Sequence, residues 1–71
     1  MIHFNMDPKE ALEHMSADQK DALITIASRW RKVEVVGYPS GTMTPYVSLL
    51  VYGEGEGKMF LGVEPDGYTH S

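Results

Sequence analysis

The histidines are the side chains best suited to metal chemistry, because the chain contains no cysteine. Glu10 and His14 stand four positions apart, a spacing that places both on one face of a helix, and His70 could approach them from the sheet. A structural zinc site needs four protein ligands and a catalytic site three. A small enzyme or metal-dependent module that uses Glu10, His14 and His70 is therefore kept as an alternative. A weak surface pair of Glu10 and His14 is the simpler interpretation.

Other patterns that could support catalysis are weak. Glu34 and Glu64 fall on the same side of a predicted sheet, but a chain of 71 residues has little material for the enclosed pocket that acid–base catalysis needs. The glycine-rich run over residues 53–58 lacks the GxxxxGK order of a phosphate-binding loop and is typical of a hairpin connection. We therefore expect neither enzymatic activity nor a cofactor.

The charge distribution argues against nucleic acid as a partner. The net charge is −4, and residues 33–71 contain one basic residue, Lys58, against five acidic residues. Phosphate contacts require cations, so this half would repel a nucleic-acid backbone. A binder of single-stranded nucleic acid that stacks bases on sheet aromatics is a second alternative.

No apolar run approaches the roughly 18 residues that read as a membrane span, so we expect no membrane partner. Residues 1–10 lack the basic and apolar regions of a secretory signal. A cytoplasmic location is the corresponding expectation.

Helix start signals occur twice in the first half of the chain. Asp7 can cap free N–H groups, Pro8 suits the first helical position, and Glu10 can complete a capping box. Ser16 and Gln19 repeat this signal. The pattern predicts a short helix over 8–14, a break near 15–16 and a longer helix over 17–31, with one bent helix as the alternative.

The second half changes to the period-two alternation of strands. A loop over residues 39–45 and a glycine-rich hairpin over 53–57 separate the strand candidates, and short connections favour antiparallel pairing. Residues 2–4 could add an edge strand. Strands are predicted over residues 33–38, 46–52, 58–64 and 68–70.

The predicted architecture is one small α+β domain over residues 1–71. One or two N-terminal helices, within about residues 7–32, pack on a three- to four-stranded antiparallel meander within about residues 33–70. An apolar helix stripe should cover the aliphatic side of this sheet. The stripe consists of Leu23, Ile26, Ala27 and Trp30, and the aliphatic side of Val33, Val35, Val47, Leu49, Val51, Met59, Leu61 and Val63.

The opposite side of the predicted sheet is unusually apolar. An open antiparallel sheet normally shows water a mostly polar face, and a contiguous exposed apolar patch usually marks an interaction site. Whether residues 1–6 fold over this side decides whether the patch is available. The predicted interface residues are Val36, Tyr38, Tyr46, Leu50, Tyr52 and Phe60.

The main functional prediction is a small non-catalytic protein-interaction module. A short chain without disulfides often depends on association to bury enough apolar surface. We expect it to bind itself, as a homodimer formed sheet to sheet, or to bind another protein as a regulator or inhibitor of a larger one.

Overall fold

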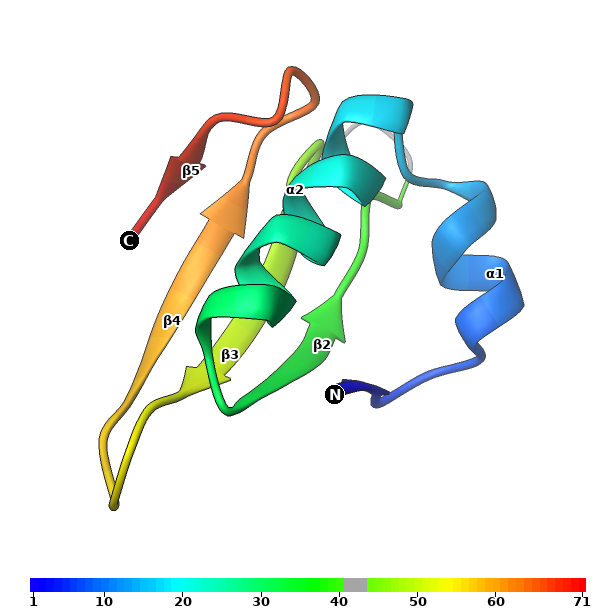
Figure 1. Cartoon of the computed structure of the whole chain (residues 1–71). Helices are drawn as coiled ribbons and strands as arrows, with labels where there is room; N and C mark the ends of the chain where they lie inside the picture. The colour runs from blue at the N-terminus through cyan, green and yellow to red at the C-terminus, as the bar shows by residue number, and fades with distance from the viewer. Residues whose placement is uncertain (41–43) are drawn as a thin grey trace.

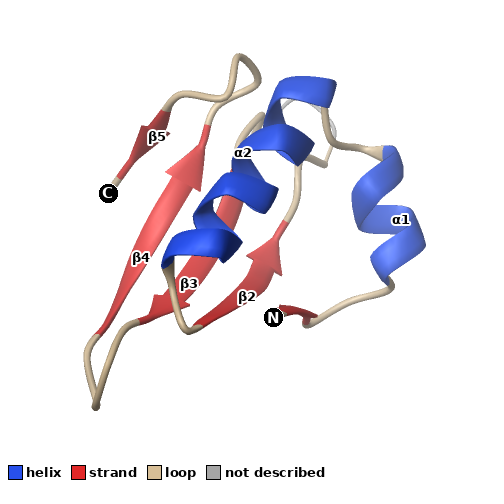
Figure 2. Ribbon diagram, viewed as in Figure 1, coloured by secondary structure: helices blue, strands red, loops and turns tan. Residues whose placement is uncertain are grey.

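The computed structural model describes residues 1–40 and 44–71, and it confirms the α+β class (Figures 1 and 2). Both helices lie on the same side of the sheet. Residues 41–43, in the middle of the predicted loop, lie outside the described residues. In chain order the elements are β1 (Ile2–Phe4), α1 (Pro8–Glu13), α2 (Ala17–Arg29), β2 (Lys32–Gly37), β3 (Val47–Tyr52), β4 (Lys58–Val63) and β5 (Thr69–His70).

The two predicted helices and the break between them are confirmed. Ser16 and Gln19 form the capping box, because the Gln19 N–H donates to Ser16 Oγ at 3.0 Å and the Ser16 N–H donates to Gln19 Oε1 at 2.8 Å. The prediction for the first helix was wrong in one respect. Asp7 occupies the capping position but makes no side-chain cap hydrogen bond. Pro8, whose φ is fixed near the helical value, begins α1.

Gln19 also joins α2 to the sheet, whereas the sequence had predicted only its part in the capping box. Its side chain is 2% exposed, and Nε2 donates to the carbonyl oxygens of Pro45 at 2.9 Å and Val63 at 3.1 Å. The same amide oxygen accepts the Ser16 N–H. A buried amide is tolerated because its hydrogen bonds are made, and these bonds hold the N-terminal end of α2 over β3 and β4.

The sheet has the strand order β1–β2–β3–β4–β5. β2 to β5 form the predicted antiparallel meander, with β5 shorter than expected at Thr69–His70. β1 is the fifth strand and pairs with β2 in parallel, Ile2 opposite Val33 and Phe4 opposite Val35. A parallel neighbour requires a long crossover, which the two helices supply. The sheet is therefore mixed and mostly antiparallel.

The core lies between α2, α1 and the aliphatic side of β2 and β3. Val33, Val35, Leu49 and Val51 have no exposed surface, and they pack with Leu23 and Ile26 of α2 and with Met15, which lies between the two helices. Full burial of such a side chain contributes roughly 1.5–3 kcal/mol before entropy is subtracted. Met59 was predicted to belong to this layer but remains 43% exposed.

A β-bulge in β2 corrects the predicted strand phase. Val35 pairs with Leu49, but the next pair is Gly37 with Ser48, so Val36 is an extra residue. After a bulge the alternation is shifted by one position. Tyr38 therefore packs against the core cluster on the helical side, with its ring centroid 5.3 Å from that of His14 in the segment after α1.

Candidate functional site

The candidate site is the face of the sheet opposite the two helices, which we call the outer face. The N-terminal strand lies in the plane of the sheet, at the edge beside β2, so residues 2–4 do not fold over this face. Along β3 every second residue is buried and the others are half-exposed. Phe60 of β4 is 64% exposed.

Strand register arranges the outer face in rows that run across the strands. The first row is Lys32, Tyr52 and Lys58, and the second is His3, Glu34, Leu50 and Phe60. The third row is Gly37, Ser48, Gly62 and His70. Tyr46 and Glu64 stand at the end beyond the third row, directly outside the pair Val47–Val63. Large apolar side chains in the second row thus adjoin small residues in the third.

The first two rows are joined by a tyrosine–carboxylate hydrogen bond. Tyr52 Oη donates to Glu34 Oε1 at 3.0 Å, and this bond is the first cause that lowers the pKa of Glu34 from its ordinary value. The same bond is the first cause that raises the pKa of Tyr52. Lys32 Nζ lies 5.0 Å from the centroid of the Tyr52 ring, within the range of a cation–π contact. The interactions hold the Tyr52 ring at this end of the face.

The other end is organised around His70. Its ring lies over Gly62, where an added Cβ would sit 2.8 Å from His70 Cε1, and Nε2 lies 2.7 Å from Glu64 Oε2. The rings of Tyr46 and Tyr68 have centroids 6.0 and 6.2 Å from the His70 ring. Glycine at position 62 leaves the space that the imidazole occupies, and a side chain there would require the His70 ring to move.

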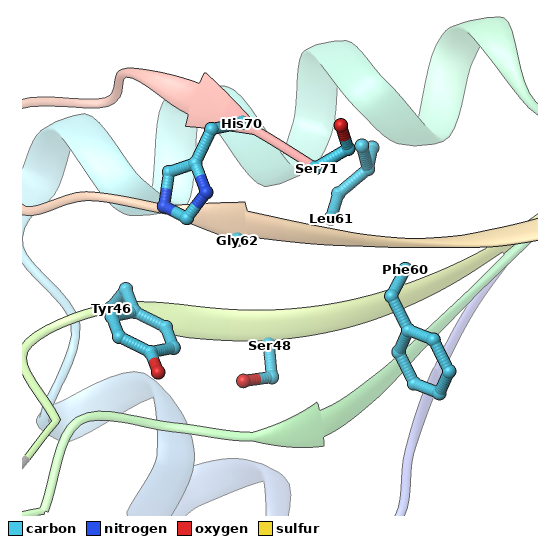
Figure 3. A pocket seen from close by; sticks show the side chains of 7 residues that line it. All are labelled: Tyr46, Ser48, Phe60, Leu61, Gly62, His70 and Ser71. Carbon is cyan, nitrogen blue, oxygen red and sulfur yellow. The ribbon is translucent and has the colours of Figure 1, made fainter.

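These residues border a shallow hollow of about 250 Å³ between Phe60 and His70. Figure 3 shows the hollow from the outer face, with the helices behind the sheet and the Phe60 ring across it from Tyr46 and His70. Its floor is the small-residue row at Ser48 and Gly62. The hollow can therefore accept an apolar side chain from outside.

Four of the six predicted interface residues lie on the outer face, and the β2 bulge changes the position of the other two. Tyr46, Leu50, Tyr52 and Phe60 lie on the outer face, as the alternation predicted. Val36 is the half-buried extra residue of the bulge, and, as described above, Tyr38 is turned to the helical side. Position alone does not test their role in binding.

Sequence reasoning did not assign His70, Gly62 and Ser48 to the site. Alternation had placed Gly62 and Ser48 on this face, and the Pro65-Asp66-Gly67 turn signal was the available indication that His70 returns beside β4. The contact between the His70 ring and Gly62 depends on β5 docking and has no sequence signal.

The metal-ligand alternative is not supported by the arrangement of its residues. His14 Nδ1 bonds the backbone oxygen of Glu10 at 2.8 Å, so its proton lies on Nδ1 in that bond, and the predicted side-chain pair is not formed. His70 instead bonds Glu64 at the opposite edge of the sheet. Among residues 1–40 and 44–71, no three histidine, aspartate or glutamate side chains gather closely enough to hold a metal ion.

The two carboxylates considered for acid–base chemistry are also held apart by separate partners. Glu34, in the second row of the face, accepts a hydrogen bond from Tyr52 in the first row. Glu64, just beyond the end of β4, bonds His70. General acid–base catalysis by a carboxylate pair needs both groups at one reacting centre. The outer face is instead an open surface on which the exposed side chain of Phe60 lies beside a shallow hollow.

Neither helix in the described part of the chain has the length and apolar composition of a membrane span. Comparison with known proteins found no significant match to a family, to a curated protein or to a solved structure.

Proposed function

We propose that this chain is a non-catalytic interaction module that forms a homodimer through the outer face of its sheet. The observation that carries the proposal is the exposure of Phe60, 64% of whose surface remains open in the middle of β4. Leu50 and Tyr52 flank it, half-exposed, while both helices cover the other side of the sheet. An apolar patch of this kind on a small protein usually marks an association surface.

A second copy fits the face because the face is complementary to itself. The pair Leu49–Leu61 lies midway between the apolar pair Leu50–Phe60 and the small pair Ser48–Gly62. A two-fold axis that crosses the strands above this pair sets Phe60 of each protomer beside the His70 ring that covers Gly62 of its partner, at the edge of the hollow. It also sets Leu50 of each protomer over Ser48 of the other. Such an isologous contact uses one patch twice.

The charges favour the same axis. Lys58 lies at the hairpin end of β4 and Glu64 just beyond its other end. The axis across the strands brings Lys58 of one protomer toward Glu64 of the other. An axis along the strands would instead bring Lys58 toward Lys58, and like charges across an interface are unfavourable.

The size of the face sets how much of it must be used. The three central strands are 6 residues long each, about 20 Å, and neighbouring strands lie about 4.8 Å apart, so the face offers at most about the 800 Å² per partner of a standard interface. A stable dimer must therefore bury most of the outer face, and substitutions near its centre are the sharpest test.

Sedimentation equilibrium of Leu50→Glu tests the proposal. An unpaired carboxylate in an apolar interface should raise the dimer Kd by at least about tenfold. Ile24→Glu is the control, because Ile24 is an aliphatic residue that is exposed but lies on α2, in the opposite layer. A wild-type protein that stays monomeric at high micromolar concentration would remove the proposal, as would equal effects of the two variants.

A further inference from the structure

One edge of the sheet is only half covered. β5 pairs with Gly62 and Val63 of β4 and ends there, so the segment Lys58–Leu61 has no neighbouring strand on that side among the described residues. Figure 1 shows β5 beside only the arrowhead end of β4. Met59 and Phe60 in the uncovered segment are both exposed. An open apolar edge is a template for another strand.

The backbone of this segment has groups that face outward. In antiparallel pairs, alternate residues direct both N–H and C=O to the same neighbour. The Glu64 N–H donates to the Tyr68 oxygen at 2.8 Å, on the β5 side of β4. By alternation, Phe60 and Lys58 also direct their N–H and C=O groups to that side, beyond the end of β5. These groups can form ladder hydrogen bonds with an incoming strand.

A groove lies beside this edge on the helical side of the sheet, with a volume of about 420 Å³. It separates α2 from β4 and β5, and its walls are mainly apolar. An added strand would point every second side chain toward it. The lining residues are Ala22, Thr25, Ile26, Arg29, Trp30, Met59, Leu61, Gly67 and Thr69.

We propose that the free edge of β4 and this groove bind an extended segment of another protein by strand addition. The segment runs antiparallel to β4, in line with β5, and bonds to Phe60 and Lys58. Its residue opposite Met59 is large and apolar and fills the groove. Strand addition of this kind takes affinity from backbone hydrogen bonds and selectivity from pockets for alternate side chains.

Charge complementarity defines the next residue of the segment. It stands opposite Lys58, where an acidic side chain forms a favourable cross-strand pair. Arg29 is the charged side chain among the groove residues, so the groove disfavours a basic residue at the apolar position. The selected motif is therefore an apolar residue followed by an acidic one. This site shares only the Lys58 side chain with the proposed dimer contact, since it otherwise uses the backbone edge and the helical side.

Trp30 supplies the readout, because it is the only tryptophan in the chain and lines the groove. The probe is a capped synthetic peptide of alternating threonine and valine with one leucine followed by glutamate. We expect a saturable change in Trp30 fluorescence. Replacing that glutamate by lysine should weaken binding by about fivefold, and Lys58→Glu should reverse the preference between the two peptides.

Amide hydrogen exchange then locates the peptide. The amides of Phe60 and Lys58 should exchange rapidly in the free protein and become protected when the leucine–glutamate peptide binds. The inference fails if Trp30 fluorescence does not saturate or if these amides stay unprotected. It also fails if their protection in the peptide-free Leu50→Glu variant, whose outer face should no longer associate, rises with protein concentration, because a second copy would then occupy the edge. The first two outcomes do not depend on whether Leu50→Glu weakens the dimer.

Discussion

The imidazole of His70 occupies the space above Gly62 that any other residue would fill with its side chain. A Cβ at position 62 would lie 2.8 Å from His70 Cε1 and 3.0 Å from Nε2. This contact seats β5 against β4, together with the bond from His70 to Glu64. One wall of the hollow on the outer face therefore depends on a residue with no side chain.

Gly62→Ala should displace the His70 ring and loosen β5. Overpacking a well-packed core costs about 1–3 kcal/mol; because the His70 side chain is 38% exposed and its ring can move, we expect a loss near or below the lower end of that range, measured by denaturant unfolding. Gly57→Ala is the control, since its added Cβ would meet only the Glu54 oxygen, at 3.9 Å. Equal losses of stability in the two variants would show that the His70 contact is not the cause.

Gln19→Leu should destabilise the fold although it adds an apolar residue to a buried position. The substitution leaves the carbonyl oxygens of Pro45 and Val63 without the donor that now reaches them, and an unsatisfied buried group costs about 1–3 kcal/mol. Urea unfolding measures the change, with exposed Lys20→Leu as the control. An unchanged or higher stability for Gln19→Leu contradicts the role assigned to this amide.

Tyr52→Phe should raise the pKa of Glu34, because it removes the hydrogen bond that is the first cause of the lowered value. A carboxyl whose pKa is lowered on folding stabilises the protein above its unfolded pKa, and this stability is lost as pH falls through the folded pKa. The loss on acidification should therefore be smaller in Tyr52→Phe. Carboxyl NMR titration tests the shift, and Tyr46→Phe should leave the Glu34 titration unchanged.

Ser48→Leu tests the two-fold arrangement of the proposed dimer. Leucine would fill the floor of the hollow that receives the partner's side chains, so dimerisation should weaken by about tenfold or more, as overpacked contacts do. A dimer held only by unspecific apolar contact should instead become tighter. Sedimentation equilibrium distinguishes the two outcomes. Ser28→Leu is the control, because it makes the same change at an exposed position of α2, in the other layer.

A charge swap gives a second check of that arrangement. Lys58→Glu and Glu64→Lys should each weaken the dimer, and the double variant should recover part of the loss because the two positions exchange charges across the axis. Carbodiimide cross-linking between Lys58 and Glu64 of different protomers is expected in the wild type. Cross-links between the two Lys58 amines with an amine-reactive bifunctional reagent, and no carbodiimide product, would indicate an axis along the strands.

Local patterns predicted much of the fold. The capping box of Ser16 with Gln19 gave the start of α2, and period-two alternation separated Leu50 and Phe60 from the buried layer. Alternation failed at Tyr38, because a bulge shifts the phase without a distinct residue signature. The contacts of His70 and the buried hydrogen bonds of Gln19 were also missed, since both depend on elements that meet only in the folded chain.

The parallel pairing of β1 has a consequence for the order in which the chain folds. Ile2 pairs with Val33 across 31 positions, whereas β2 to β5 pair with their sequence neighbours. Closing so long a loop costs more entropy than closing a hairpin, so we expect β1 to dock last and detach first. Its transient release would expose the edge of β2. Native-state proteolysis near residue 5 should reveal this opening at a free energy well below that of global unfolding.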